Sequence, residues 1–286
     1  MLKNMKKSLP IIKDDPWLQP FAPAIEGRHE DALKKMKELA GKGKLSDFAN
    51  AYNYYGLHRT DNGWTFREWA PNATDIYIVG PFNEWTECEP YRMKRLTDGN
   101  WEINLPERAM AHGDLFKLHV HWNGGWGERI PAYATRVVQD DTTKIFSAQV
   151  WNPEKPYEFK VHDFVPTVDP LLIYECHIGM AQNKEAVGSY EEFRTEVLPR
   201  IVKLGYNAIQ IMAIQEHPYY GSFGYHVSSF YAASSRFGTP EELKHLIDDA
   251  HAHGLAVIMD IVHSHAVKNE VEGLGRFDGS DGVGVL

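Results

Sequence analysis

The spacing of apolar residues changes twice along the chain and predicts three different kinds of structure. A helical period comes first, with four apolar residues on one face: Ile25, Leu33, Met36 and Leu39. Short runs in which apolar and polar residues alternate follow between residues 61 and 150, as in antiparallel strands. After Pro170, continuous apolar runs alternate with helical patterns, as in parallel sheets covered by helices.

The first region, residues 1–60, is expected to form a helical N-terminal segment. Its main helix should end at the glycines of Ala40-Gly-Lys-Gly-Lys44, since glycine readily adopts the backbone conformation that closes a helix. The two prolines of Pro16-Trp-Leu-Gln-Pro20 lead us to expect an extended stretch before that helix.

The second region, residues 61–155, is expected to be an antiparallel β-sandwich. Four runs have the alternation of strands: residues 64–69, 75–79, 101–105 and 116–122. Turn sequences separate them, including Asp98-Gly-Asn100 and Asn123-Gly-Gly125. Short alternating strands with turns between them are typical of such a sandwich.

A proline-rich connector with Pro153, Pro156 and Pro166 leads into the third region, residues 156–286. Buried strands are expected at residues 171–177, 207–214 and 255–261. Two helix starts stand between them, Ser189 with Glu192 three residues on, and Thr239 followed by proline. Such right-handed strand–helix units begin both a barrel and a doubly wound sheet, and the pattern alone leaves both open.

Composition narrows the function classes. A chain of 286 residues, 43% hydrophobic and 24% charged, is long enough for two folded domains. Its net charge of −9 and the lack of a basic stripe argue against a nucleic-acid partner. No apolar run approaches the roughly 20 residues of a membrane span, and the start lacks the apolar core of a signal peptide. Cys88 and Cys176 fit neither a metal site nor a disulfide framework, so we expect a reduced, cytoplasmic protein.

Residues that could carry chemistry gather where the three strands of the third region end. They are Glu175 and His177, then Gln215, Glu216 and His217, then Asp260, His263 and His265. The residue types at the third strand end allow a metal site, a structural hydrogen-bond network, or a polar ring that grips the hydroxyls of a substrate. The aromatic loop of residues 219–225 either packs beneath a long loop or offers flat rings to a sugar.

Blocks of sequence in all three regions occur in one known family in the same order. They are Ala213-Ile-Gln-Glu-His-Pro-Tyr-Tyr-Gly-Ser-Phe-Gly-Tyr225, residues 234–244, 260–269 and 273–279, Glu68-Trp-Ala-Pro71, Gly80-Pro-Phe-Asn-Glu-Trp85 and Asp15-Pro-Trp-Leu-Gln-Pro-Phe21. These blocks resemble the glycogen and starch branching enzymes of eukaryotic type, within the α-amylase superfamily. The resemblance implies a helical N-terminal segment, an immunoglobulin-like starch-binding β-sandwich, and the first three β/α units of a truncated TIM-type (β/α)8 barrel.

The resemblance also implies an enzyme that cuts an α-1,4-glucan and rejoins the fragment through an α-1,6 bond. Such enzymes use an Asp nucleophile, a Glu acid/base and a third Asp, which follow barrel strands four, five and seven. We expect those strands beyond residue 286, so no catalytic residue is assigned within the chain. Asp278 stands in a similar motif, Arg276-Phe-Asp-Gly279, but it follows His265 too soon to be the nucleophile. The reaction implies no organic cofactor and no catalytic metal, and a structural ion is left open.

Sugar-binding residues are implied by the same resemblance. Tyr225 is expected to stack on the sugar at the cleavage site, His265 to hydrogen-bond a hydroxyl, and Asp260 to brace the site. The implied oligoglucan contacts in the sandwich are Trp69, Ala70, Pro71, Thr97, Asp98, Gly99, Asn100 and Lys117. A Trp69 buried in its strand is the alternative. The implied partner is an α-glucan (glycogen, amylose or starch), bound by a monomer.

Two functions stay open for the chain itself. Its parent would transfer glucan, whereas the chain as it stands is expected to be inactive, a glucan-binding module with an inert barrel remnant. A debranching hydrolase is disfavoured by the blocks at residues 213–225 and 260–269. A barrel lacking five strands should leave an unpaired edge and an uncovered apolar face, so residues 170–286 alone should be unstable or aggregate.

Overall fold

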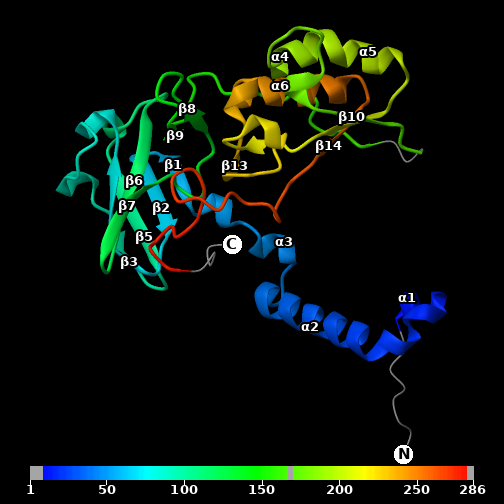
Figure 1. The fold of residues 1–286 in the computed structure, drawn as a ribbon, viewed down its shortest axis with the longest axis horizontal. Coiled ribbons are helices and arrows are strands. Elements are labelled where there is room, and N and C mark those ends of the chain that lie inside the picture. The colour runs from blue at the N-terminus through cyan, green and yellow to red at the C-terminus, as the bar shows by residue number, and fades with distance from the viewer. Residues whose placement is uncertain (1–8, 167–169, 282–286) are drawn as a thin grey trace, which may run out of the picture. The chain divides into compact units, whose positions relative to one another are not determined.

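The computed structural model of the chain describes residues 9–166 and 170–281 (Figure 1). The chain divides into two compact units, Met1–Tyr54 and Tyr55–Leu286. The sandwich and barrel regions therefore share one unit. The helical unit ends before the boundary expected at residue 60, because strand β1 (Gly56–Thr60) already pairs with the sandwich. No helix within the described ranges is long and apolar enough to cross a membrane.

Helices make up most of the described part of the first unit. They are α1 (Pro10–Asp14), the 3-10 helix η1 (Pro16–Phe21), α2 (Ala22–Ala40), α3 (Leu45–Phe48) and η2 (Ala51–Asn53). Helix α2 confirms the predicted amphipathic helix, and Gly41 with φ of 58° follows its last residue. The extended stretch expected before it is wrong. Pro16 starts a 3-10 helix instead, because the Asp15 carboxylate accepts a hydrogen bond of 2.9 Å from the backbone N–H of Trp17.

The second unit begins with the predicted β-sandwich. One sheet has the strand order β1-β2-β5-β4, with β2 (Gly63–Trp69), β5 (Asn100–Leu105) and β4 (Lys94–Arg95). The other has the order β3-β6-β9-β8, with β7 also paired to β6. Its strands are β3 (Ala73–Val79), β6 (Leu115–Trp122), β7 (Gly125–Arg129), β8 (Val137–Gln139) and β9 (Phe146–Gln149). Alternate residues of facing strands, such as Phe66 and Leu118, form the buried core between the sheets.

Three parallel strands in the order β10-β11-β14 form the barrel part. They are β10 (Ile173–Cys176), β11 (Ala208–Ile211) and β14 (Ala256–Met259). The first crossover holds α4 (Tyr190–Glu192), a π-helical turn (Phe193–Val197) and α5 (Leu198–Lys203), and the second holds α6 (Pro240–Ala252). Capping boxes at Ser189 and Thr239 confirm both predicted helix starts. A short hairpin, β12 (Gln215–Glu216) with β13 (Ser229–Ala233), extends from the end of β11.

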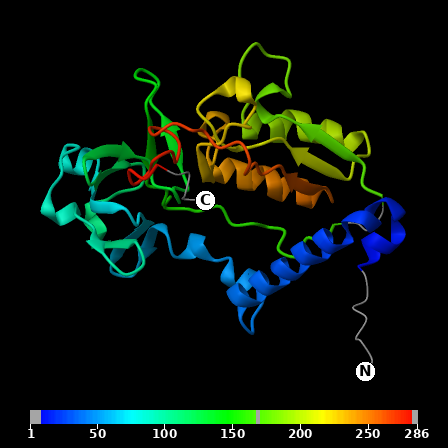
Figure 2. The same cartoon turned by 60° about the horizontal axis from the view of Figure 1, so that its bottom comes forward.

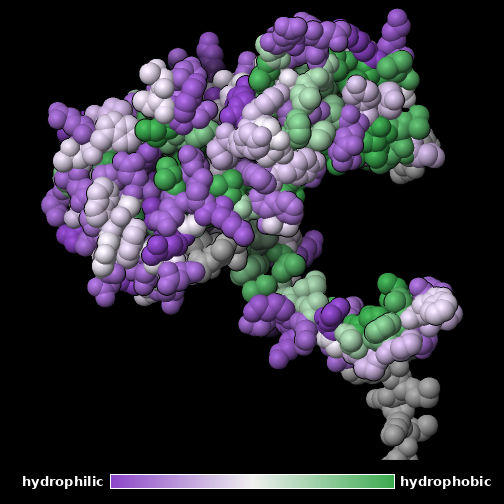
Figure 3. All heavy atoms as spheres, viewed as in Figure 1, coloured by the Kyte–Doolittle hydropathy of each residue, from purple (hydrophilic) through white to green (hydrophobic). Residues whose placement is uncertain are grey.

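The three barrel strands are less buried than their apolar sequences predicted. Residues of α4–α6 cover one side of them, in a core that includes Tyr190, Phe193 and Leu246. On the strands themselves Ile173, Met259 and the nearby Ile261 are exposed, and Figure 3 shows apolar surface beside β10. Within the described chain each of β10 and β14 has one neighbouring strand, so the predicted uncovered face and unpaired edges are present.

The segment after β14 joins the barrel part to the sandwich. It crosses from the barrel part to the sandwich strands in both ribbon views (Figure 2). Leu274 and Phe277 are buried in the sandwich core. The buried guanidinium of Arg129 on β7 donates to the carbonyls of Arg276 and Phe277 at 2.9 and 3.1 Å. These contacts, between residues almost 150 positions apart, make one unit of the two regions.

Candidate functional site

The carboxyl ends of β10, β11 and β14 lie side by side, because parallel strands in register end at the same edge of the sheet. Backbone hydrogen bonds extend this pairing past the strands: the Met212 N–H donates to Cys176 and the Asp260 N–H donates to Ile211. The side chains that follow each strand are therefore close neighbours, as the sequence predicts.

Tyr225 and Asp260 meet at this edge. The Tyr225 hydroxyl donates a hydrogen bond of 2.7 Å to Oδ2 of Asp260, and both side chains are partly exposed. This bond, with burial, raises the pKa of Tyr225 to about 12, so the phenol stays protonated at neutral pH. Gly224 makes the approach possible: its φ is 90°, and a Cβ there would lie 1.7 Å from the carbonyl oxygen of Ala213.

His265 lies on the same edge and is exposed. A parallel backbone bridge pairs Ala266 with Val227, so His265 is held beside the loop that carries Tyr225. One of its ring nitrogens, Nδ1, is 2.7 Å from the hydroxyl of Ser264, which leaves Nε2 directed away from that bond. His263 stacks on the Phe230 ring at 6.0 Å. Tyr225, Asp260 and His265, which are expected to bind the sugar at the cleavage site, are thus brought to one rim at the carboxyl edge of the strands.

Glu216 and His217, at the end of the second strand, are buried beneath the rim. The Glu216 carboxylate accepts hydrogen bonds from the backbone N–H groups of Ser235 at 2.7 Å and His217 at 3.1 Å, and from the Ser234 hydroxyl at 3.3 Å. Burial raises its pKa. A carboxylate with its oxygens occupied this way holds the β12–β13 hairpin together.

His177, after the first strand, sits in an aromatic surround. The edges of Tyr220, Phe223 and Phe237 face its ring at 5.4–5.8 Å. Burial lowers its pKa, so the imidazole is neutral at pH 7. In the aromatic loop, Tyr220 packs against the buried core of the barrel part, whereas Tyr219 is 64% exposed.

No group of three or more His, Cys, Asp or Glu side chains in the described ranges is arranged to hold a metal ion. The strand-end histidines are engaged with Ser264 and with Phe230 instead. The metal alternative for Asp260, His263 and His265 therefore finds no support in the geometry.

Asp278 is buried in the loop after the third strand and anchors it to the sandwich. Its Oδ2 accepts a bond of 2.8 Å from the backbone N–H of Asn72, and its carbonyl accepts one of 2.9 Å from the Asn72 amide. The Ser280 hydroxyl donates to Oδ1 at 2.7 Å. Burial raises the pKa of Asp278, but the hydrogen bonds from Ser280 and Asn72 to its carboxylate outweigh burial and lower the pKa below its usual value. The bonds to Asn72 tie the loop after the third strand to the start of β3.

Most of the expected oligoglucan contacts of the sandwich form one cluster. The indole N–H of Trp69 donates to the Asp98 carbonyl at 2.9 Å, and the Ala70 N–H donates to Gly99 at 2.9 Å. Pro71 lies against Gly99, where a Cβ would come within 2.7 Å of the proline ring. Trp69 is half-buried, so its face is partly available, whereas the Ala70 side chain is fully buried and offers no ligand contact.

Lys117 lies away from that cluster. Lys117 is on β6, where it pairs with Val79 of β3. Val79 is six residues along β3 from Ala73, which follows the turn at Pro71. At about 3.3 Å a residue the separation along the strand is roughly 20 Å. Its buried ammonium donates to Glu128 at 2.8 Å. Lys117 on β6 and Trp69 on β2 thus lie on different sheets.

A second polar and aromatic surface surrounds Lys117, and the sequence reasoning missed it. Trp126 on β7 is 56% exposed and packs on the rings of His119 and His121 at 4.9 and 6.0 Å. Glu87 accepts from both histidines. The alternation of residues 116–122 could have predicted this surface. The apolar residues at even positions enter the core, so Lys117, His119 and His121 must line the outer face of the sheet.

Comparisons with known proteins define the class. The family model for carbohydrate-binding module 48 (isoamylase N-terminal domain) matches residues 54–134, and that for the α-amylase catalytic domain matches residues 185–272. The pullulanase of Bacillus acidopullulyticus has a similar fold, with a TM-score of 0.60 and 17% identity over 77% of this chain and 32% of its own. A pullulanase of Paenibacillus barengoltzii, solved with maltohexaose and α-cyclodextrin, gives a TM-score of 0.57 and 22% identity, covering 74% and 38%. The chain is a β-sandwich that matches the carbohydrate-binding module 48 family, followed by part of an α-amylase-type TIM barrel.

The sequence relatives are more specific. The 1,4-alpha-glucan-branching enzyme of Yarrowia lipolytica is 46% identical over 284 residues, 96% of this chain and 41% of that protein. The enzyme of the same name from Equus caballus is 40% identical and covers 95% and 40%. The chain thus spans about two fifths of the curated relatives' length. Its predicted resemblance to the branching enzymes of the α-amylase superfamily is confirmed across nearly all of its residues.

Proposed function

We propose that the protein to which this chain belongs is a 1,4-α-glucan branching enzyme, a glycosyltransferase that cuts α-1,4-glucan and rejoins the fragment as an α-1,6 branch. The names of relatives 40–46% identical over some 95% of the chain support this reaction. The single observation that carries the site is the Tyr225–Asp260 hydrogen bond at the carboxyl edge of the barrel strands.

The rim formed by Tyr225, Asp260 and His265 is proposed to hold the sugar at the cleavage point. The flat ring of Tyr225 suits the apolar face of a pyranose, and its hydroxyl is fixed by Asp260. His265 presents an exposed imidazole that can donate to or accept from a sugar hydroxyl. The hydrogen bond to Tyr225 occupies one oxygen of Asp260, and the second oxygen can accept a hydroxyl proton.

We further propose that the 286-residue chain binds glucan without transferring it. A retaining double displacement needs two carboxylates on either side of the scissile bond. The strand-end carboxylates described here have other partners: Glu216 is buried under backbone N–H groups, Glu175 accepts from Gln210 at 3.2 Å, and Asp260 accepts from Tyr225. The non-catalytic module is therefore the second candidate function, and the exposed Trp126 surface favours it.

Glucan binding by the sandwich is proposed at two surfaces. One is the cluster of Trp69 with the turn of residues 97–100, and the other is the outer face around Lys117 and Trp126. We also propose that the protein is cytoplasmic and monomeric. Cys88 and Cys176 are both free thiols, as expected in a reducing compartment, and light scattering on a sizing column would test the monomer.

A branching assay on residues 1–286 with amylose tests the proposal, together with affinity electrophoresis in glycogen gels. Expected are retarded migration and no new α-1,6 linkages. Tyr225→Ala and Trp126→Ala should each reduce the retardation. Trp17→Ala is the matched control, because that indole is 86% exposed and lies in the other unit.

Three outcomes would contradict parts of this proposal. Branching by the isolated chain would mean that it contains the catalytic carboxylates, and Glu216, Asp260 and Asp278 would need to be tested again. Absence of branching by the full-length protein would sink the enzyme assignment. Migration unaffected by glycogen would sink the binding module.

A further inference from the structure

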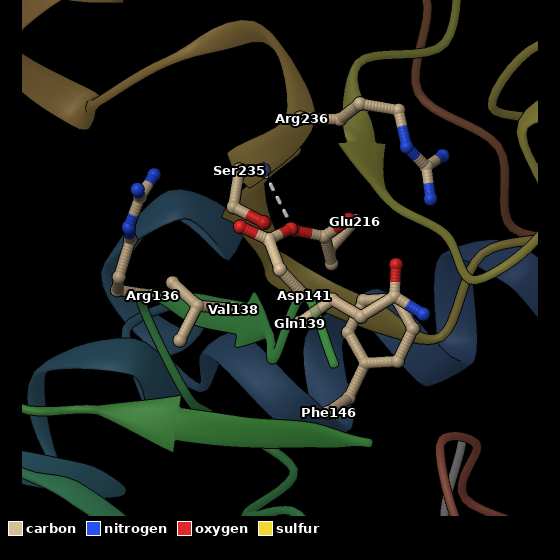
Figure 4. Close-up of a pocket in the computed structure, with 8 residues that line it drawn as sticks. All are labelled: Arg136, Val138, Gln139, Asp141, Phe146, Glu216, Ser235 and Arg236. Atoms are coloured by element: carbon tan, nitrogen blue, oxygen red, sulfur yellow. Dashed lines mark hydrogen bonds between the residues drawn. The ribbon is translucent and has the colours of Figure 1, made fainter. Parts of the chain in front are cut away.

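Gln215 and Glu216 follow one another on β12, but their side chains serve different parts of the barrel region. Glu216 lines a cavity of about 390 Å³ together with Arg136 of the sandwich and Arg236 (Figure 4). Gln215 is also buried, but it lines a separate cavity of about 200 Å³, which Asp260 lines as well. The glutamine therefore lies on the side of the hairpin that faces the rim.

The amide group of Gln215 bridges the hairpin and the segment that follows β14. Its Nε2 donates a hydrogen bond of 2.9 Å to the carbonyl of Phe230 on β13. Its Oε1 accepts one of 2.9 Å from the backbone N–H of Val262. Val262 lies between Asp260 and His265 in the sequence. One buried side chain thus connects the hairpin to the segment that supplies two of the three rim residues.

The backbone at both contacts explains why an amide suits this position. A bulge between Gln215 and Glu216 leaves Phe230 outside the paired positions of β13. Val262 lies beyond the end of β14, where the parallel pairing has stopped. The bridge therefore needs a donor for one carbonyl and an acceptor for one N–H, and a glutamine amide carries both.

A small apolar cluster surrounds the bridge beneath the rim. Val227 and Val262 are buried in it, and the rings of Tyr225 and Phe230 pack against it. The ring of His263 stacks on Phe230 at 6.0 Å. Apolar contacts are not directional, so they allow the segment after β14 to slide. Two hydrogen bonds to one amide fix its distance from the hairpin.

We propose that Gln215 is a positioning residue of the glucan site, which holds the segment of Asp260 and His265 against the loop of Tyr225. The side chain is 7% exposed and both amide atoms have protein partners, so it acts through the rim residues and does not contact the sugar. The inference rests on the proposed function of the rim. It means that the amide at position 215, rather than the size of the side chain, sets the affinity for glucan.

A double-mutant cycle on residues 1–286 tests this role, with affinity measured by electrophoresis in glycogen gels. Gln215→Met keeps the length of the side chain but loses both amide bonds, and should weaken glycogen binding about fivefold. In a Tyr225→Ala background the same change should weaken binding less than about twofold, because residues that act together are not additive. Gln139→Met is the matched control. That amide also donates to a backbone carbonyl, that of Lys144 at 2.8 Å, but it lies in the sandwich, so the variant should bind like the wild type.

A second readout needs no sugar. The carbon-13 NMR signal of the Tyr225 Cζ atom, assigned by its absence in Tyr225→Phe, reports the hydrogen bond of 2.7 Å to Asp260. Gln215→Met should shift this signal, because the segment of Asp260 is no longer held, whereas Gln139→Met should leave it unchanged. Thermal unfolding shows that each variant is folded.

Gln215→Glu provides a rescue within one variant and decides the matter if Gln215→Met does not fold. A protonated carboxylic acid can donate to Phe230 and accept from Val262 as the amide does, whereas a carboxylate has no donor. Burial favours the protonated form. Relative to the wild type at the same pH, the variant should bind glycogen equally well at about pH 5 and about fivefold more weakly at about pH 8.

Three results would overturn the positioning role: additive losses in the double-mutant cycle, an unshifted Tyr225 signal in Gln215→Met, or the same relative affinity of Gln215→Glu at both pH values. Failure of the rim itself gives a different result. If Tyr225→Ala binds glycogen like the wild type, the rim does not bind glucan, and the role of Gln215 in glucan binding is refuted with it.

Discussion

The hydroxyl of Tyr225 donates a hydrogen bond of 2.7 Å to the Oδ2 atom of Asp260, and so joins the loop after the second barrel strand to the end of the third. The bond fixes the tilt of a partly exposed ring whose apolar face is the candidate stacking surface for a sugar. Mutation can separate the effect of the ring from that of the hydrogen bond, because phenylalanine at position 225 keeps the aromatic ring but lacks the hydroxyl.

Tyr225→Phe should therefore lower the free energy of unfolding by about 1 kcal/mol, the usual value of one hydrogen bond, and lower glycogen affinity only slightly. Tyr225→Ala should lower the affinity by about tenfold or more, because it removes the ring itself. Affinity electrophoresis and urea unfolding measure the two effects. Equal loss of glycogen binding in both variants would show that the hydroxyl, not the ring face, contacts the sugar.

Asp278→Ala should lower the free energy of unfolding by about 3 kcal/mol, because it leaves the Asn72 N–H and the Ser280 hydroxyl without their acceptor in a buried loop. Asp281→Ala is the matched control three residues on. That carboxylate is 98% exposed, and its loss should change stability by no more than about 0.5 kcal/mol. Urea unfolding measures the unfolding free energy of the two variants. Equal stability of Asp278→Ala and Asp281→Ala would contradict the anchoring role of Asp278.

Glu68 should make the chain less stable as the pH rises from about 4.5 to 7. The carboxyl is fully buried, where desolvation raises its pKa to about 7, although the N–H groups of Trp69 and Ala132 oppose this at 2.9 Å each. The folded state then binds the proton more tightly than the unfolded state, so stability is greatest below the unfolded pKa and falls as the pH rises toward the folded pKa. The loss could reach about 3 kcal/mol.

Comparison of wild type with Glu68→Gln isolates this effect, since glutamine does not titrate. The difference in unfolding free energy between the two should change steadily across that pH window. Glu84→Gln controls for the same substitution at an exposed carboxylate. A difference that stays constant from pH 4.5 to 8 would show that Glu68 is ionised throughout.

Residues 170–286 produced alone should aggregate, whereas residues 55–286 should be better behaved. Without the sandwich, Leu274 and Phe277 lose their cover, and they add to the apolar surface already exposed at Leu172, Ile173 and Met259. Light scattering during refolding compares the two chains. Reversible, cooperative unfolding of a soluble monomer by residues 170–286 would contradict the expectation.

Local sequence was enough to predict most elements and the strand-end residues, but not their surroundings. The capping boxes at Ser189 and Thr239 involve residues three positions apart, and the structure contains both. Strand β1 was missed because His58, Arg59 and Thr60 are polar, and its place is set by pairing with β2. The expected extended stretch at residues 16–20 failed because the Asp15 side chain caps a 3-10 turn there.

The sequence by itself determined the two folded regions, the parallel strand–helix order and the branching-enzyme resemblance, because period, caps and motif order are local properties of the chain. Only the tertiary structure decided which acidic groups face solvent. Asp260 reaches the rim, whereas Glu216 is buried and Asp278 is bonded to Asn72, 206 positions away. The same holds for the separation of Lys117 from Trp69 and for the cavity between Arg136 and Arg236. Such relationships depend on contacts between distant segments, which no local pattern encodes.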